Sequence, residues 1–190
     1  MTVDLLAHLR DLSATAARAA DTLGPSIAKG AAMVQLTVQR GGVLFFCGNG
    51  GSAADAQHMA TEYVVRYRRE RRAIAAIALT TDTSLLTATG NDYSFDMIFA
   101  RQVDALCRPG DLLILHTTSG KSPNLLRAVE AARAKGVATL ALSAKGGGPI
   151  AALVDHCIVV PTDRTDRAQE IQLAIEHAIC ELIDEEVFEG

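Results

Sequence analysis

The sequence contains no tryptophan and few aromatic residues of any kind, 4% of its 190 residues. Surfaces that stack nucleic-acid bases and grooves that line sugars depend on such side chains, so this composition argues against both. An excess of positive charge is also missing, because 18 Lys and Arg residues face 22 Asp and Glu residues, for a net charge of −4. The chain therefore has no general attraction for polyanions, and any anion site must be local. We predict no nucleic-acid partner.

Long apolar runs are absent as well. No stretch approaches the ~20 apolar residues of a membrane-spanning helix, and the N-terminal segment carries charges throughout, unlike a secretory signal. Cys47, Cys107, Cys157 and Cys180 are scattered without a C-x-x-C pair, and three of them have apolar neighbours, which is typical of buried thiols in a reducing compartment. These absences predict a cytoplasmic protein without a membrane partner. The length and the 49% hydrophobic content fit one globular domain.

Short apolar segments alternate with helical segments along most of the chain. The expected strands are 43–47, 74–79, 111–115, 137–142 and 157–160, and the expected helices are 53–66, 85–89, 95–106, 123–135, a short one after Gly148, and 166–186. Strands that are apolar on both faces are typical of a parallel sheet covered on each side. We therefore expect an α/β fold, a three-layer sandwich around a five-stranded parallel sheet.

Two amphipathic helical segments precede the first expected strand. Leu5, Leu6 and Leu9 recur at helical spacing, and Gly24-Pro25 predicts a break before a second helix that ends near Gln39. The pattern predicts a helical hairpin within 1–40, followed by an α/β core over 41–190 of the same domain. Because the apolar stripe of such an appendage needs a partner, we expect these helices to mediate oligomerisation.

Two loops that follow expected strands have residues suited to binding an anion. Both lie at the carboxyl edge of the expected parallel sheet, where ligands bind in such folds. Gly48-Asn49-Gly50-Gly51-Ser52 leads directly into a helix, and Thr117 to Ser122 surrounds Gly120 with four hydroxyls and Lys121. Glycines that serve packing alone, or a hydroxyl-rich turn without a ligand, are the alternative interpretations. A P-loop is excluded because no glycine lies five positions before Gly120. A dinucleotide site is weakly supported, because the acidic residue expected at the end of the following strand, about 20 residues on, is missing.

Three further features carry charge. His58 and Glu62 are four residues apart and so share one helix face. They are interpreted either as two metal ligands or as partners in a surface hydrogen bond. His177 lies in an apolar stretch, where it is either a core histidine bonded to a carbonyl or part of a site. The basic run 66–72 is interpreted as a solvated helix end or loop, with an anion or a neighbouring subunit as the alternative partner.

Taken together, these residues resemble the phosphoheptose isomerase family of SIS-domain proteins. The resemblance covers essentially the whole chain, and its most specific elements are 48–58, Glu62, 66–68, 90–92, 118–120 with Ser122, Asp166-Arg167 with Gln169-Glu170, and His177. It implies an enzyme, an intramolecular oxidoreductase that converts sedoheptulose 7-phosphate to D-glycero-D-manno-heptose 7-phosphate through an enediol. The product would serve lipopolysaccharide heptose biosynthesis.

The resemblance also implies a role for each matching residue. Glu62 and His177 would be catalytic, and one Zn²⁺ per subunit would be held by His58, Glu62, Gln169 and His177. The substrate would contact Asn49, Gly50, Gly51, Ser52, Glu62, Asn91, Asp92, Thr117, Thr118, Ser119, Ser122, Asp166 and Gln169. The family implies a homotetramer with active sites at subunit interfaces.

Some questions stay open at this point. Gln169 and His177 are eight residues apart, roughly 12 Å along a helix, so they share a metal only if their side chains lean together or the helix begins after Gln169. Otherwise they come from different subunits, or Gln169 serves the substrate. Lys121, where the family commonly has Asn, leaves room for a different sugar phosphate.

Two rival functions also fit a SIS domain. One is a non-catalytic SIS protein that associates with the DnaA initiator, and the other is a regulatory domain that senses a sugar phosphate. The non-catalytic branch lacks the catalytic carboxylate and the histidine of the last helix, so Glu62 and His177 favour the enzyme.

Overall fold

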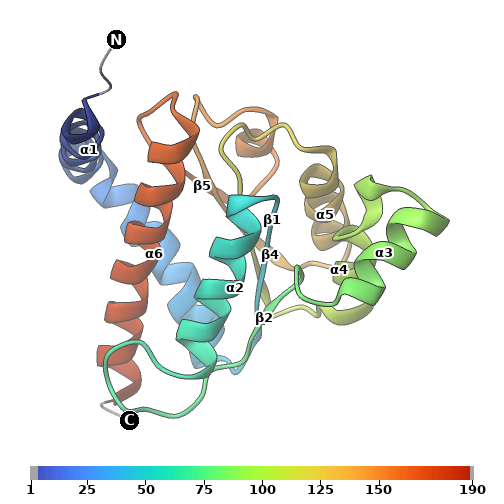
Figure 1. Ribbon diagram of the computed structural model, residues 1–190. Helices are drawn as coiled ribbons and strands as arrows, with labels where there is room; N and C mark the ends of the chain where they lie inside the picture. Colours follow the sequence, from blue (N-terminus) through green and yellow to red (C-terminus); the bar gives the residue numbers. More distant parts are fainter. Residues whose placement is uncertain (1–3, 189–190) are drawn as a thin grey trace.

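A computed structural model describes residues 4–188, which form three layers (Figure 1). The helices are α1 (Leu5–Gln39), α2 (Gly51–Val64), α3 (Thr83–Asp92), α4 (Ala100–Leu106), α5 (Pro123–Ala134) and α6 (Thr165–Phe188), with the 3-10 helices η1 (Phe95–Met97) and η2 (Pro149–Ala152). The strands are β1 (Leu44–Gly48), β2 (Ala76–Ala78), β3 (Leu112–His116), β4 (Ala138–Ser143) and β5 (His156–Val159). The predicted alternation of strands and helices is confirmed.

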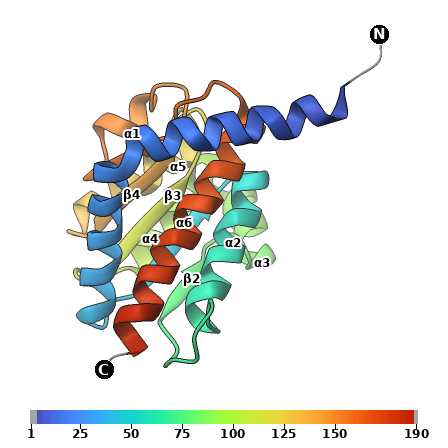
Figure 2. The same cartoon turned by 90° about the vertical axis from the view of Figure 1, so that its left-hand side faces the viewer.

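All five strands are parallel and lie in the order β2-β1-β3-β4-β5. The register pairs Gly48 with His116, so the two loops that sequence analysis singled out leave the sheet side by side. Helices α1, α2 and α6 cover one face, and α4 and α5 cover the other (Figures 1 and 2). The predicted three-layer sandwich around a five-stranded parallel sheet is therefore confirmed.

The N-terminal hairpin is the part of the fold that the sequence predicted wrongly. One helix, α1, runs from Leu5 to Gln39 with Pro25 inside it, and it changes direction part-way along its length (Figure 2). Proline removes one helical hydrogen bond and crowds the preceding turn, which bends a helix without necessarily ending it. Both halves bury apolar side chains against the body, with Ala19 before the proline and Val34 after it. This packing supports the helix through the break.

Smaller differences concern the edges of elements. The predicted strand 74–79 shortens to three residues at the edge of the sheet, and the predicted helix 95–106 divides into η1 and α4 around the buried residues Ile98 and Phe99. Asn91 and Asp92, which lie beyond the predicted helix 85–89, form the last two residues of α3. Within residues 4–188, no helix has the length and apolar character needed to cross a bilayer.

Candidate active site

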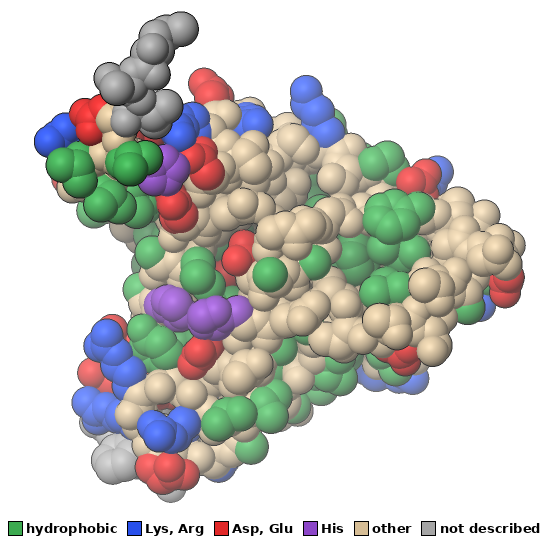
Figure 3. Space-filling model, viewed as in Figure 1, with side chains coloured by type: hydrophobic (Ala, Val, Ile, Leu, Met, Phe, Trp, Pro, Cys, Tyr) green, Lys and Arg blue, Asp and Glu red, His purple; other side chains and the backbone are tan. Residues whose placement is uncertain are grey.

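Three side chains from two helices meet on one side of the molecule. Nε2 of His58 lies 3.1 Å from Oε1 of Glu62 and 3.2 Å from Nε2 of His177. One ligand atom from each of the three residues falls within 4.8 Å of the others, the only such His, Cys, Asp and Glu group found within the described chain. Figure 3 shows two adjacent histidine side chains on a concave side of the surface, with an acidic side chain beside them. His58, Glu62 and His177 are called the histidine–glutamate cluster below.

The packing of α2 beside α6 brings this cluster together. The two helices lie side by side on the same face of the sheet (Figure 2). His58 and Glu62 share a face of α2 because they are one helical turn apart. The His177 ring on α6 is tilted against the His58 ring, with centroids 5.1 Å apart, and is stacked on the Tyr67 ring at 5.2 Å. Tyr67 was part of the family pattern but had no predicted role.

Gln169 lies apart from the cluster within one chain. Helix α6 begins at Thr165, before Gln169, so the interpretation in which the helix starts after it is wrong. The Gln169 amide lies against the backbone of Gly51, where even a Cβ atom would come within 2.5 Å of Nε2. Gly51 starts α2, about 10 Å before His58 by helix rise. The chain therefore brings together three of the four predicted zinc ligands and places the fourth beside the glycine-rich loop.

The residue that precedes His177 belongs to a buried ion pair. Nε2 of His116, at the end of β3, is 2.8 Å from Oε1 of Glu176, the residue before His177, and both side chains are almost fully buried. Burial alone would lower the pKa of His116, but the Glu176 carboxylate raises it above its usual value. The Phe46 ring stacks on His116 at 6.1 Å. Sequence analysis missed this pair, although a histidine ending an apolar strand was a visible signal for a buried partner.

The glycine-rich and hydroxyl-rich loops are joined by a residue that sequence analysis did not single out. The Asn49 and Asn124 amides donate to each other reciprocally, at 2.9 and 2.8 Å. Asn124 is buried in the first turn of α5. This exchange fixes the two loops relative to each other at the carboxyl edge of β1 and β3.

The hydroxyl-rich loop is shaped by its own side chains. Thr117 Oγ1 accepts from the Gly120 amide at 3.1 Å, and Ser119 Oγ accepts from the Lys121 amide at 3.3 Å. Gly120 has a φ of 65°, and a Cβ there would lie 2.0 Å from the Gly147 carbonyl, so only glycine fits. Ser122 caps α5 without a side-chain bond to its amides. Pro123, the first residue of α5, has no amide hydrogen, and the Leu125 amide donates to the Ser122 carbonyl at 3.1 Å.

The remaining predicted residues lie at the ends of helices or in the hydroxyl-rich loop. Ser52 is buried in the first turn of α2, next to Gly50 and Gly51. Asn91 donates to Asp92 at 2.8 Å on the exposed end of α3. Asp166 accepts from Arg164 at 2.6 Å, and this bond holds its pKa at about 2. Thr118 is partly buried within the hydroxyl-rich loop.

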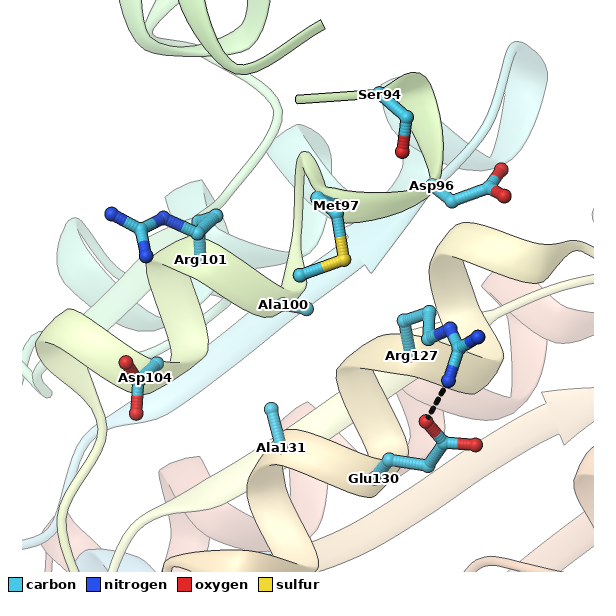
Figure 4. A pocket seen from close by; sticks show the side chains of 9 residues that line it. All are labelled: Ser94, Asp96, Met97, Ala100, Arg101, Asp104, Arg127, Glu130 and Ala131. Carbon is cyan, nitrogen blue, oxygen red and sulfur yellow. Dashed lines mark hydrogen bonds and ion pairs between the residues drawn. The ribbon is translucent and has the colours of Figure 1, made fainter. Parts of the chain in front are cut away.

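A pocket on the opposite side of the sheet contains none of the predicted residues. It has a volume of about 450 Å³ and lies between α4 and α5, where Figure 4 shows Arg101, Asp104, Arg127 and Glu130 around Met97. Its charges are of both signs, and Arg127 is bonded to Glu130 at 2.8 Å. The predicted residues other than Asn91 and Asp92, which lie on α3, are therefore found on α2, on α6 and in the two loops.

Comparison with known proteins shows the family of the chain. Residues 7–144 match the family described as the SIS domain. A phosphoheptose isomerase from Roseiflexus sp. is 49% identical over 172 residues, which cover 90% of this chain and 87% of that protein. Another from Rhodospirillum rubrum is 51% identical over 161 residues, or 85% of this chain and 86% of the relative. The chain belongs to the SIS-domain family of phosphoheptose isomerases.

Solved structures of phosphoheptose isomerases have the same fold. The enzyme from Neisseria gonorrhoeae superposes with a TM-score of 0.91 at 41% identity, covering 95% of this chain and 97% of that one. The enzyme from Francisella tularensis gives 0.92 at 35% identity, covering 95% and 96%. The sugar isomerase domain of an RpiR transcription factor from Sphaerobacter thermophilus, 20% identical with a TM-score of 0.67, shares the fold alone. The family resemblance drawn from the sequence is confirmed.

The donor atoms of the cluster fit a metal ion. Two imidazole nitrogens and one carboxylate oxygen are a ligand set of catalytic zinc sites, in which a further position stays open for water or substrate. The side chains of His58 and Glu62 are 43% and 21% exposed, so a ligand can reach them from solvent. The cluster thus brings together three donor atoms whose chemistry fits a metal ion.

Proposed function

We propose that the protein interconverts sedoheptulose 7-phosphate and D-glycero-D-manno-heptose 7-phosphate. One observation carries the proposal: Glu62 and His177, 115 positions apart in the sequence, both contact His58 in a chain of the phosphoheptose isomerase family. A non-catalytic SIS protein has no need of a carboxylate and an imidazole in one exposed cluster. We place the reaction in the cytoplasm, where it supplies heptose for lipopolysaccharide.

The reaction moves a proton between two neighbouring carbons. Glu62 takes a proton from C1 of the ketose to give a cis-enediolate, and it returns the proton to C2 to give the aldose. His177 moves the proton of the C1 hydroxyl to O2, so the carbonyl passes from C2 to C1 without a net change in protons. The Tyr67 ring packed on the imidazole limits its movement. Neither step needs an oxidant or a reductant.

Zinc is the metal that we propose for the cluster. His58, Glu62 and His177 would hold it, while Gln169, set beside Gly51, would contact the substrate or the zinc of a neighbouring subunit. When bound, zinc supplies a Lewis acid that polarises a carbonyl and stabilises an enediolate. A carboxylate cannot bind metal tightly and act as an unhindered base at once, so we expect Glu62 to exchange between these roles.

The phosphate is held at the two loops. Its oxygens are surrounded by the hydroxyl side chains of Ser52, Thr117, Thr118, Ser119 and Ser122. The rest of the open sugar is contacted by Asn49, Gly50, Gly51, Asn91, Asp92 and Asp166. The phosphate does not react, and its binding energy holds C1 and C2 in place for proton transfer.

A homotetramer would complete the site. Ser52 and Glu62 are ten residues apart on α2, about 15 Å by helix rise, so the phosphate loops and the cluster of one chain are well separated. Leu5, Leu6 and Leu9 at the start of α1 are 77%, 58% and 61% exposed, an apolar stripe that a second copy would cover. We propose active sites at these subunit interfaces, where α1 mediates oligomerisation.

Direct turnover tests the proposed function. Purified protein is incubated with sedoheptulose 7-phosphate, and the aldose product is followed by NMR of its anomeric protons. We expect turnover that chelation lowers and added Zn²⁺ restores. Absence of product with Zn²⁺ present would reject the proposal. Turnover of a different ketose phosphate alone would keep the isomerase chemistry and reject the substrate.

A further inference from the structure

Most residues of the basic run 66–72 are exposed, as expected for a solvated loop, but Arg71 turns inward. Arg71 has a side chain only 1% exposed, and its Nε donates to Oδ1 of Asp184 on α6 at 2.6 Å. The Asp184 side chain is also 1% exposed. Two other arginines of the run, Arg68 and Arg69, pair with Glu181 and Glu185 at the surface of the same helix. One buried and two exposed ion pairs therefore join this loop to α6.

The buried arginine also holds the end of α2. Arg71 Nη2 donates to the Glu62 carbonyl at 2.8 Å, and Nη1 donates to the Tyr63 carbonyl at 3.0 Å. Carbonyls in the last turn of a helix lack intrahelical partners, and a cation there also favours the helix dipole. The contact therefore fixes the backbone of the residue to which we assign the carbon base.

Asp184 completes the link on the other helix. Its second oxygen, Oδ2, accepts from the amides of Arg68 at 2.7 Å and Arg69 at 3.0 Å. Asp184 follows His177 by seven residues, which is two helical turns, so both lie on the same side of α6. The backbone of Glu62 is thus connected to α6, the helix of His177, by the Arg71 guanidinium and the Asp184 carboxylate.

A buried ion pair is weak support for stability, because the cost of removing both charges from water offsets their attraction. It restricts geometry strongly, since a planar guanidinium holds several acceptors in fixed directions. Here those acceptors belong to the end of α2 and to α6, the two helices whose side chains form the histidine–glutamate cluster. The loop also supplies the Tyr67 ring that stacks on His177.

We propose that the Arg71–Asp184 pair is a positioning device that sets the separation of Glu62 and His177 for proton transfer and metal binding. The proposal rests on the proposed function for its effect on turnover. Its effect on metal binding depends only on the geometry of the cluster. Both side chains are only 1% exposed, so we expect neither to touch the substrate.

A matched pair of variants tests the proposal. Asp184→Asn removes the buried charge with little change of shape, and Glu185→Gln removes the neighbouring exposed charge. We expect kcat to fall about 10- to 100-fold in Asp184→Asn with KM changed less than about twofold, because misplacement of reacting groups by about 1 Å costs up to that factor while the phosphate loops stay intact. Glu185→Gln should change neither. Equal kcat in the two variants would overturn the proposal.

A second variant separates positioning from loss of folding. Arg71→Met/Asp184→Leu replaces the pair with apolar side chains, a change that often leaves stability intact. We expect it to keep the cooperative thermal unfolding of the wild type and to show the low kcat of Asp184→Asn. A folded double variant with wild-type kcat would overturn the proposal. This outcome decides the question even if Asp184→Asn alone does not fold.

Zinc binding to the metal-free protein, measured by calorimetry, separates this proposal from the proposed function. We expect the double variant to bind Zn²⁺ at least about tenfold more weakly than Glu185→Gln. If the wild type lacks isomerase turnover, the proposed function fails, and this difference in affinity still supports the positioning role. Equal zinc affinities would overturn that role.

Discussion

The two faces of the sheet have cores of different character. Between the sheet and α4 and α5, the core is almost wholly apolar, and the buried Gln102 there satisfies its amide with the carbonyls of Leu79 and Ile98. Under α2 and α6, the buried side chains include the charged groups of His116, Glu176, Arg71 and Asp184. One face therefore has an ordinary apolar core, and the other buries ionisable side chains as well.

Charged groups are costly to bury unless each is paired and hydrogen-bonded. On the face of α2 and α6, His116 pairs with Glu176 and Arg71 pairs with Asp184, but Nδ1 of His116 and Oε2 of Glu176 have no hydrogen-bond partner among the described residues. The apolar face has no comparable group among the described residues, and its pocket is lined by exposed charges. We therefore expect side chains on both faces to contribute to stability, and only those on the face of α2 and α6 to contribute to catalysis.

The sharpest test of this division is the substitution Glu62→Gln. Removing the carbon base should lower turnover by about 10²- to 10⁴-fold, the range for general acid–base groups, because the amide cannot accept the proton. Circular dichroism should show an unchanged fold. Glu130→Gln on α5, an exposed carboxylate of the other face, is the control and should keep full turnover. Near-normal turnover in Glu62→Gln would remove its assigned role.

The opposite face should respond in stability alone. Val103 on α4 is fully buried, and Val103→Ala removes two carbon atoms and leaves a small cavity. We expect the free energy of unfolding to fall by about 2 kcal/mol, from the lost burial together with the cavity. Urea unfolding measures this loss, while kcat below the unfolding midpoint should equal that of the wild type. A drop in kcat of the folded variant would break the division between the faces.

Acid should weaken the face of α2 and α6 first. Burial alone would raise the pKa of Asp184, but hydrogen bonds from the Arg69 and Arg68 amides and from Arg71 lower it below its ordinary value of 3.8. A carboxyl whose pKa is lower in the folded state stabilises the fold above its unfolded pKa and loses that effect as the pH falls through its folded pKa. We expect the free energy of unfolding to decrease below about pH 4.

Asp184→Asn separates this contribution from the general effect of acid. The variant should show a smaller decrease than Glu185→Gln when urea unfolding is repeated at pH 5 and pH 3. Identical pH dependence in the two variants would assign the effect to other carboxylates.

The smallest effect is expected in the pocket of Figure 4. Arg127 and Glu130 form an ion pair with side chains 58% and 56% exposed. Pairs in water contribute little, because solvent and salt screen them. Arg127→Ala should change neither the thermal midpoint nor turnover measurably. A clear loss of turnover would show that the apolar face also carries function.

Much of the fold followed from local pattern. Each expected strand of apolar residues became a strand within a few positions, because a run such as 112–115 can only be buried on both faces. Pro25 was misjudged because its effect depends on what α1 packs against, and no local signal carries that. The role of Asn124 was missed for the same reason, since its partner Asn49 lies 75 residues away.

The sequence by itself determined the parallel sheet, the two anion-favouring loops and the shared face of His58 and Glu62, because each depends on residues within a few turns of one another. Only the tertiary structure decided that His177 joins that face while Gln169 lies beside Gly51, and that Arg71 turns inward to Asp184. These choices join segments more than 100 residues apart. They are set by how α2 and α6 pack on the sheet, which the burial of many side chains decides together.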